Sequence, residues 1–162
     1  MTPSLIVFDL DFTLWDAGGT WCDHLYPPFK NSPNGPVDSH DRLVRLYDDV
    51  RDILDWCQEH QVRMALASRT YEPKWAKKLI KLLEIADLFE YHEIFPASKV
   101  THFSNLHEAS GIPLREMLFF DDEMRNIYEV GRMGVTSMFV ENGMDMKLFK
   151  EGLKKWESKW LN

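Results

Sequence analysis

The chain has 162 residues, 44% of them hydrophobic, with a formal net charge of −7 and a sequence pI near 5.3. This length and composition predict one globular domain over residues 1–162 and exclude an intrinsically disordered chain. The acidic balance argues against nucleic-acid binding, and no apolar run approaches the roughly 20 residues of a membrane helix. Because the first apolar stretch is too short for a signal peptide, we expect a soluble cytoplasmic protein.

Short apolar runs alternate with amphipathic segments along the chain. Four runs are apolar almost throughout, as strands buried on both faces are, and a fifth is weaker: 5–8, 62–67, 117–120, 135–140 and, the weak one, 93–95. Apolar residues at helical spacing predict helices around 50–57, 75–83, 103–110, 127–131 and 149–160. Strands that alternate with helices predict a Rossmann-like three-layer α/β sandwich with a central parallel sheet.

Residues 16–45 break this rhythm between the first strand and the first helix. They are rich in proline and glycine, with Trp21, Tyr26 and Phe29 interspersed, and Asn34-Gly35 is a hairpin-turn signal. A loop of this length is uncommon in a compact domain and is often functional. We expect a small flap packed over one end of the sheet, and the alternative is a surface insertion without function.

Four residues that could suggest other sites have simpler interpretations. Cys22 and Cys57 do not make a disulfide framework, and no second Cys/His pair at zinc spacing follows Cys22. Cys57 falls on the apolar face of a predicted helix and is expected in the core. His102 and His107 also fall on a predicted helix, where we expect them at the surface or partly packed.

Polar side chains follow four of the predicted strands, at the carboxyl ends where open α/β sheets bind ligands. They are Asp9, Asp11, Ser68, Arg69, Lys99, Asp121 and Asp122. Clustered carboxylates repel one another unless a cation compensates them, and Mg²⁺ suits a site with few carboxylates that also binds phosphate. With two cations to face an anionic substrate, the set predicts phosphoryl transfer.

The string Asp9-Leu10-Asp11-Phe12-Thr13 resembles the DxDxT signature of haloacid dehalogenase (HAD) superfamily phosphatases, and the later strand-end residues match that superfamily's other motifs in order. Three longer strings, together with Pro27-Pro28-Phe29, resemble the magnesium-dependent phosphatase-1 family: Ala67-Ser68-Arg69-Thr70, Ser98-Lys99-Val100-Thr101-His102-Phe103 and Phe119-Phe120-Asp121-Asp122-Glu123. This resemblance implies a compact HAD fold without a large cap domain. The stretch 15–22 is more glycine-rich than the family pattern.

The resemblance also implies a role for each residue. Asp9 would attack phosphorus and become an aspartyl-phosphate, and Asp11 would protonate the leaving oxygen and then deprotonate water. Ser68 would donate a hydrogen bond to a phosphoryl oxygen, and Lys99 would offset charge on the nucleophile and the phosphate. The implied substrate-binding set is Leu10, Thr13, Ser68, Arg69 and Lys99, in which Thr13 holds the loop geometry and Arg69 clamps the substrate.

Magnesium would be held by Asp9, the backbone carbonyl of Asp11, and Asp122. Asp122 is preferred because it stands four residues before Asn126, the spacing of the superfamily's last motif. Asp121 would have a secondary role. The resemblance implies phosphate monoester substrates of the phosphotyrosine or phosphosugar type, on a small molecule or a phosphoprotein, and a monomer is expected.

Other functions of similar folds fit less well. A receiver domain carries its acidic pair after the first strand, and a dehalogenase does not need the second aspartate of the DxD motif or magnesium. A phosphotransferase or phosphomutase of the same fold usually has a large cap. A catalytically silent phospho-ligand binding protein stays open as an alternative, although all expected catalytic groups are present.

Overall fold

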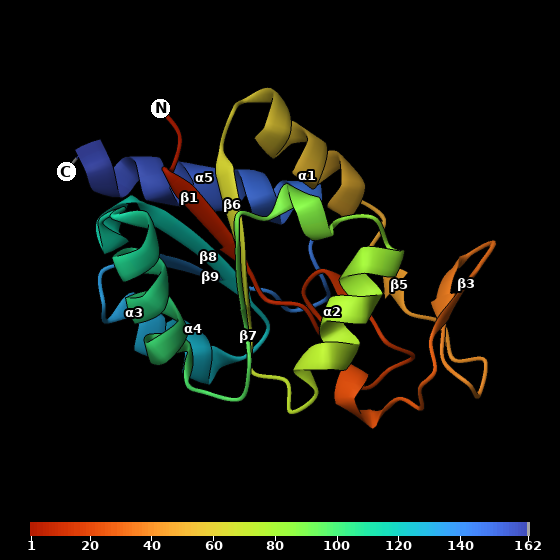
Figure 1. The fold of residues 1–162 in the computed structure, drawn as a ribbon. Helices are drawn as coiled ribbons and strands as arrows, with labels where there is room; N and C mark the ends of the chain where they lie inside the picture. Colours follow the sequence, from red (N-terminus) through yellow and green to blue (C-terminus); the bar gives the residue numbers. More distant parts are fainter. Residues whose placement is uncertain (162) are drawn as a thin grey trace.

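The structure is a computed structural model that describes residues 1–161, and a parallel sheet of five strands forms its centre (Figure 1). In spatial order the strands are β7 (Tyr91–Ile94), β6 (Arg63–Ser68), β1 (Leu5–Phe8), β8 (Met117–Asp121) and β9 (Thr136–Phe139). All five expected apolar runs overlap these strands, and the weak run at 93–95 is the edge strand β7. The prediction of a central parallel sheet is confirmed.

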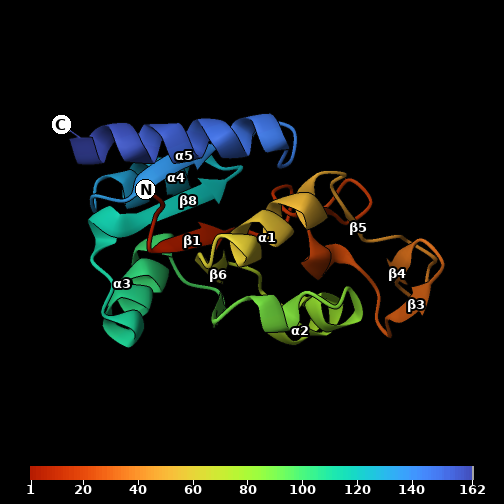
Figure 2. The same ribbon diagram turned by 90° about the horizontal axis from the view of Figure 1, so that it is seen from above.

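Helices cover both faces of the sheet: α1 (Val50–Glu59), α2 (Pro73–Leu82) and α5 (Met146–Leu161) on one, and α3 (Lys99–Ser110) and α4 (Met124–Gly131) on the other. Figure 2 shows α5 and α3 with the sheet between them. The two faces have separate hydrophobic clusters because successive strand residues point to opposite sides. This is the predicted three-layer α/β fold.

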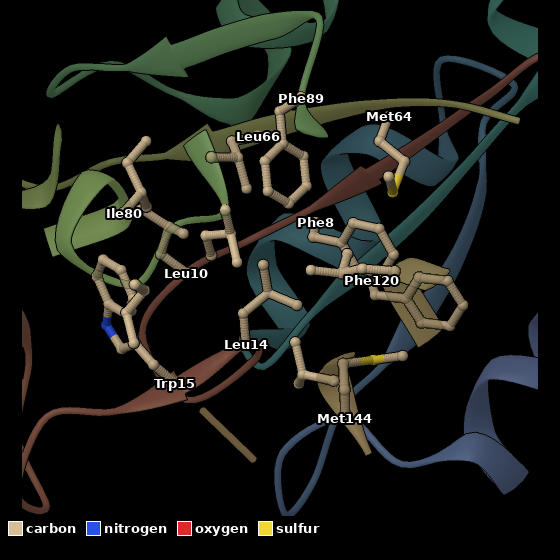
Figure 3. Close-up of a cluster of buried hydrophobic side chains, with 14 of the residues drawn as sticks. Phe8, Leu10, Leu14, Trp15, Met64, Leu66, Ile80, Phe89, Phe120 and Met144 are labelled. Carbon is tan, nitrogen blue, oxygen red and sulfur yellow. The ribbon is translucent and has the colours of Figure 1, made fainter. Parts of the chain in front are cut away.

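The larger cluster contains stacked aromatic rings from neighbouring strands (Figure 3). Phe8 and Phe120 lie with ring centroids 5.7 Å apart and an interplanar angle of 12°. Helix α5 approaches Phe120 so closely that a Cβ at Gly152 would lie 2.6 Å from its ring. The glycine therefore permits the close contact between α5 and the sheet.

The residues at the N-cap positions of α3 and α1 have different roles. Ser98 caps α3 by accepting a hydrogen bond from the Thr101 N–H, and Gly111 ends that helix with φ of 73°. Asp49 occupies the N-cap position of α1, but its carboxylate instead accepts the Met146 N–H at 2.9 Å and ties α1 to the start of α5. The cap of α3 matters for function because the helix begins at Lys99.

The segment 16–45 contains two small antiparallel pairs. Its short elements are β2 (Trp15–Asp16), η1 (Cys22–His24), β3 (Lys30–Ser32), β4 (Gly35–Val37) and β5 (Arg45–Leu46). Strands β2 and β5 pair at its base, and the β3–β4 hairpin lies at the end of the molecule beside α2 (Figure 2). The pairing of Ser32 with Gly35 places the turn at Pro33-Asn34, one residue before the expected Asn34-Gly35. That this segment is a flap in a single domain stays a prediction.

His102 corrects one expectation, because it is fully buried. Its Nε2 lies 3.0 Å from the Phe95 carbonyl oxygen, and its Nδ1 has no hydrogen-bond partner in the part of the chain that the structure describes. Burial and the charge on Lys99 lower the pKa of His102 to about 4, so the ring is neutral at pH 7. Cys57 is buried as predicted.

Among residues 1–161, no helix combines the length and the apolar character that crossing a membrane requires.

Candidate active site

The strand order brings the candidate residues to one edge of the sheet. Strand β1 lies in the middle, with β6 and β8 on its two sides. A pocket of about 360 Å³ opens at their carboxyl ends and is lined by Asp9, Asp11, Trp21, Asp23, His24, Ser68, Arg69, Thr70, Tyr71, Lys99, Asp122, Glu123, Arg125 and Asn126. The predicted convergence of the strand ends on one site is therefore present, at the place where α/β sheets bind ligands.

Lys99 is the buried cation of this site. Its Nζ lies 3.1 Å from Asp9 Oδ1 and 2.8 Å from Asp121 Oδ2, and it also donates to the Ala67 carbonyl. Burial alone would lower the pKa of Lys99, but the two carboxylates raise it above its ordinary value. Lys99 therefore stays charged, and it holds the carboxylates of two strands together.

Asp9 has donors on both carboxylate oxygens. Thr13, which is fully buried, donates its Oγ1–H to Asp9 Oδ2 at 3.0 Å, opposite the oxygen that Lys99 contacts. Burial and the neighbouring Asp121 raise the pKa of Asp9, whereas Lys99 lowers it. An ionised Asp9 therefore needs more positive charge in the pocket than Lys99 supplies.

A divalent cation fits this charge deficit. Asp9, Asp121 and Asp122 each offer a carboxylate oxygen, and these oxygens lie within 4.8 Å of one another. Lys99 contacts two of the three, Asp9 and Asp121, so the carboxylates carry more negative charge than it offsets, and their hard oxygen donors are the ligands that Mg²⁺ prefers. Burial, together with the negative charges of Asp121 and Glu123, raises the pKa of Asp122 to about 6, so a nearby cation would favour its ionised form.

The two adjacent aspartates after β8 have different surroundings. Asp121 is fully buried, and its Oδ1 accepts the Glu123 N–H at 2.8 Å while its Oδ2 accepts from Lys99 and, at 3.1 Å, from Asn126. Asn126 in turn accepts a hydrogen bond from Arg69 at 3.0 Å. Asp122 lines the pocket and Asp121 does not.

Asp11 lines the same pocket but is held by residues that follow it in the chain. Its Oδ1 accepts the Trp15 indole N–H at 2.7 Å and the Cys22 backbone N–H at 2.9 Å. Burial raises the pKa of Asp11 to about 7, although both hydrogen bonds lower it. A carboxyl group with this pKa can give and take a proton near neutral pH.

The remaining predicted site residues divide between the pocket and the core. Ser68 and Arg69 line the pocket, and Ser68 Oγ accepts the Thr70 N–H at 3.3 Å. The side chains of Leu10 and Thr13 are fully buried and do not line it. Any contact of Leu10 or Thr13 with substrate is therefore left to the backbone and stays a prediction.

Sequence reasoning missed the residues that surround the strand-end groups. Asp23 and His24 line the pocket from η1, Tyr71 from the loop after β6, and Arg125 from the first turn of α4. Trp21, one of the aromatics already noted in the expected flap, lines the pocket beside Asp23. Tyr71 and Arg125 follow β6 and β8 closely but belong to none of the strand-end motifs, and Asp23 and His24 lie in the segment 16–45, which carries no such motif. Trp15 could have been noticed because it stands four residues after Asp11. A tight loop at a strand end can bring a residue at that separation back to the aspartate.

Curated relatives resemble the chain over most of its length. It is 44% identical to human magnesium-dependent phosphatase 1 over 154 residues, which cover 94% of this chain and 86% of the relative. It is 41% identical to a HAD-like hydrolase superfamily protein of Schizosaccharomyces pombe over 147 residues, which cover 83% of each chain.

Solved structures agree on the fold. A HAD-superfamily hydrolase from Ehrlichia chaffeensis matches with a TM-score of 0.65 and 14% identity, over 99% of this chain and 98% of the other. A haloacid dehalogenase-like family hydrolase from Xanthomonas campestris matches with a TM-score of 0.67 and 10% identity, over 97% and 99% of the two chains. The acid phosphatase family model matches residues 1–159. The chain therefore belongs to the acid phosphatase family and has the HAD fold.

Proposed function

We propose that the chain is a magnesium-dependent phosphatase that hydrolyses phosphate monoesters through an aspartyl-phosphate on Asp9. The observation that carries this proposal is the placement of Asp9 at the centre of the sheet edge, between the donors Lys99 and Thr13, with Asp11 in the same pocket. A nucleophile, a separate acid/base and a buried cation are the parts that two-step phosphoryl transfer requires. The names of the curated relatives support the same activity.

In the first step, a carboxylate oxygen of Asp9 attacks phosphorus and the bond from phosphorus to the leaving oxygen breaks. Asp11 transfers its proton to that leaving oxygen, so an alcohol departs instead of an alkoxide. Ser68 and Arg69 line the pocket beside Asp9, where they would donate hydrogen bonds to the phosphoryl oxygens. Lys99 keeps positive charge next to Asp9 as the charge on the transferring group shifts.

In the second step, water attacks the phosphorus of the aspartyl-phosphate, and Asp11 accepts the proton of that water. The bond between phosphorus and the Asp9 oxygen breaks, which releases inorganic phosphate and restores the carboxylate. Asp11 is protonated again at the end, so the cycle returns both aspartates to their starting state.

Magnesium would be held by Asp9, Asp122 and the backbone carbonyl of Asp11. When bound, it supplies the positive charge that allows ionised carboxylates and a phosphoryl group to share one pocket. Asp121 has the secondary role because Lys99, Asn126 and the Glu123 N–H already occupy its oxygens. Asp122 lines the pocket beside Asp9 and is the better placed of the two.

We propose substrates of the phosphotyrosine or phosphosugar type, handled by a cytoplasmic monomer. Trp21 and Tyr71 line the pocket and are 48% and 78% exposed, which supports a leaving group with a flat or apolar face. Native mass spectrometry would test the monomer. A panel of phosphotyrosine peptides and sugar phosphates would test the substrate class. Equal rates on every member would contradict selection of the leaving group by Trp21 and Tyr71.

The first experiment measures hydrolysis of p-nitrophenyl phosphate with magnesium and with EDTA, for the wild type and for Asp9→Asn. We expect activity that requires magnesium and falls by at least about 10³-fold in Asp9→Asn, because the variant lacks the nucleophile. Asp52→Asn makes the same chemical change on the exposed face of α1 and should keep full activity.

Borohydride reduction during turnover gives a second test of the nucleophile. It should convert the acyl phosphate of Asp9 to homoserine, which peptide mass spectrometry detects. Activity that survives Asp9→Asn, or a homoserine at another position, would overturn the assignment of Asp9. A folded wild type without activity on any substrate of the panel would favour the silent binding protein instead.

A further inference from the structure

We propose that Trp15 is a positioning residue for the acid/base Asp11. Its indole N–H and the backbone N–H of Cys22 hold one carboxylate oxygen of Asp11 and leave the other oxygen to exchange the proton with the leaving group and water. This inference rests on the proposed function. It gives the segment between Trp15 and Cys22 a part in the chemistry in addition to any part in substrate selection.

The hydrogen bonds to the Asp11 side chain select one of its two oxygens. Within residues 1–161, both end on Oδ1, from Trp15 Nε1 at 2.7 Å and Cys22 N at 2.9 Å. Trp15 and Cys22 are fully buried, whereas Asp11 keeps 7% exposure on the pocket. Because Oδ1 faces two N–H donors, the proton of the neutral acid must sit on Oδ2.

Trp15 is fixed by packing and by its own backbone. Figure 3 shows its ring in the large hydrophobic cluster, beside Ile80 of α2. The backbone of Trp15 pairs with Leu46 in the β2–β5 ladder, and the Trp15 carbonyl accepts the Phe12 N–H at 2.9 Å. Phe12 adopts φ of 61°, a left-handed conformation that is rare for a bulky residue and persists only where the surroundings enforce it.

Cys22 approaches Asp11 from the other end of the same loop. The chain turns back between the two donors through Gly18 and Gly19, which have φ of 77° and 81°. The Cys22 thiol lies 3.6 Å from Thr70 Oγ1, and Thr70 follows Ser68 in the pocket wall. One oxygen of Asp11 is therefore clamped by two donors, and each donor is held in place by contacts with other parts of the structure.

This clamp matters because proton transfer depends on orientation. A general acid must reach the leaving oxygen in hydrogen-bond geometry, and a displacement of about 1 Å can cost roughly 10²-fold in rate. The alternative interpretation is that Trp15 is only a core residue. That alternative predicts a loss of stability without a change in the relative rates on different substrates. The two interpretations can therefore be distinguished by substrates whose leaving groups differ in their need for a proton.

The test compares Trp15→Phe with Trp156→Phe. Trp156 is also buried, and its indole donates to the Arg115 carbonyl at 3.2 Å, outside the lining of the pocket. For each variant, kcat/KM is measured on glycerol phosphate, whose alkoxide needs a proton to leave, and on p-nitrophenyl phosphate, whose phenolate does not. kcat/KM is the right quantity because it reports the step in which the leaving group departs.

We expect Trp15→Phe to lose about 10- to 100-fold on glycerol phosphate and less than about 3-fold on p-nitrophenyl phosphate. Trp156→Phe should leave the ratio of the two substrates unchanged. An unchanged ratio in Trp15→Phe, or an equal change in both variants, would overturn the proposal. If Trp15→Phe does not fold, 3-benzothienylalanine at position 15 keeps a bicyclic ring of similar size, replaces the N–H donor by sulfur and gives the same comparison.

A second readout does not depend on activity. The indole ¹H–¹⁵N resonance of Trp15 should shift in Asp11→Asn, which changes its acceptor. It should stay in place in Glu123→Gln, which removes a pocket carboxylate that pairs with Arg125. A resonance that does not respond to Asp11→Asn overturns the clamp, whatever the activity. A responsive resonance in a protein without phosphatase activity overturns the proposed function instead.

Discussion

Two buried aspartates in different regions of the molecule are stabilised in opposite ways. The floor lies beneath the pocket and is the buried charge cluster of Asp9, Lys99 and Asp121, in which Asp121 is 0% exposed and its charge is met by the ammonium group of Lys99. In the segment 16–45, Asp38 is 1% exposed and accepts the backbone N–H groups of Tyr26, His40 and Arg42 at 3.0, 2.9 and 2.9 Å.

The two aspartates differ in where the groups that stabilise them come from. The N–H groups around Asp38 come from residues at most 12 positions away, so one stretch of chain meets the cost of burial, and nothing in it needs to move. The floor joins residues 22 and 90 positions apart, and its balance of charge depends on what else enters the pocket. A buried carboxylate is therefore not by itself a sign of function. The groups that offset its charge are more informative, because at Asp38 they are local backbone N–H groups and at the floor they are a side chain from a distant part of the chain.

The largest expected effect comes from removing the shared cation of the floor. Lys99→Met leaves Asp9 and Asp121 buried without their partner, which should cost about 3–5 kcal/mol in the free energy of unfolding. Activity on p-nitrophenyl phosphate should fall by at least about 10²-fold. Urea unfolding and steady-state rates measure the two effects, with Lys78→Met on the exposed face of α2 as the control. If Lys99→Met were as stable and as active as the wild type, the contrast between the floor and Asp38 would be wrong.

A smaller and purely structural effect is expected at Asp38. Asn keeps only one carbonyl oxygen for the three N–H groups, so Asp38→Asn should destabilise the protein by about 1–3 kcal/mol and change kcat/KM by less than about 3-fold. Asp41→Asn, at an exposed neighbouring position, is the matched control. A large loss of activity with normal stability would show that the distal part of the segment takes part in the chemistry.

The same substitution predicts a pH dependence. Burial would raise the pKa of Asp38, but the N–H groups of Arg42, Tyr26 and His40 outweigh burial and lower it below its ordinary value of 3.8. The stability that this carboxylate adds is therefore fully present above about pH 4 and is lost as the pH falls through the folded-state pKa. Urea midpoints from pH 7 to pH 3 should show the gap between wild type and Asp38→Asn narrowing only below about pH 4.

The smallest effect is expected for an ion pair at the base of the segment. Arg45 and Asp48 lie 3.0 Å apart, with side chains 51% and 93% exposed, so water and salt screen their attraction. Asp48→Ala should change the free energy of unfolding by no more than about 0.5 kcal/mol, and less at high salt. A change as large as that of Asp38→Asn would mean that exposure is a poor guide to the strength of charge pairs here.

The central sheet, most helices and the position of the site could be predicted because their signals are local. Uniformly apolar runs such as 5–8 identify doubly covered strands, and helical spacing identifies the segments between them. Since parallel strands end at one edge, Asp9, Ser68 and Asp122 could be expected to meet without knowledge of the strand order.

The tertiary structure alone decided the contacts inside that site. The strand order β7-β6-β1-β8-β9 determines that Lys99 reaches both Asp9 and Asp121, and no periodicity records that order. The burial of His102 and the clamp of Trp15 and Cys22 on Asp11 likewise depend on which side chain fills which space. Sequence patterns report which side of an element faces the core, but a hydrogen bond between distant residues requires distances of about 3 Å that only the packed chain determines.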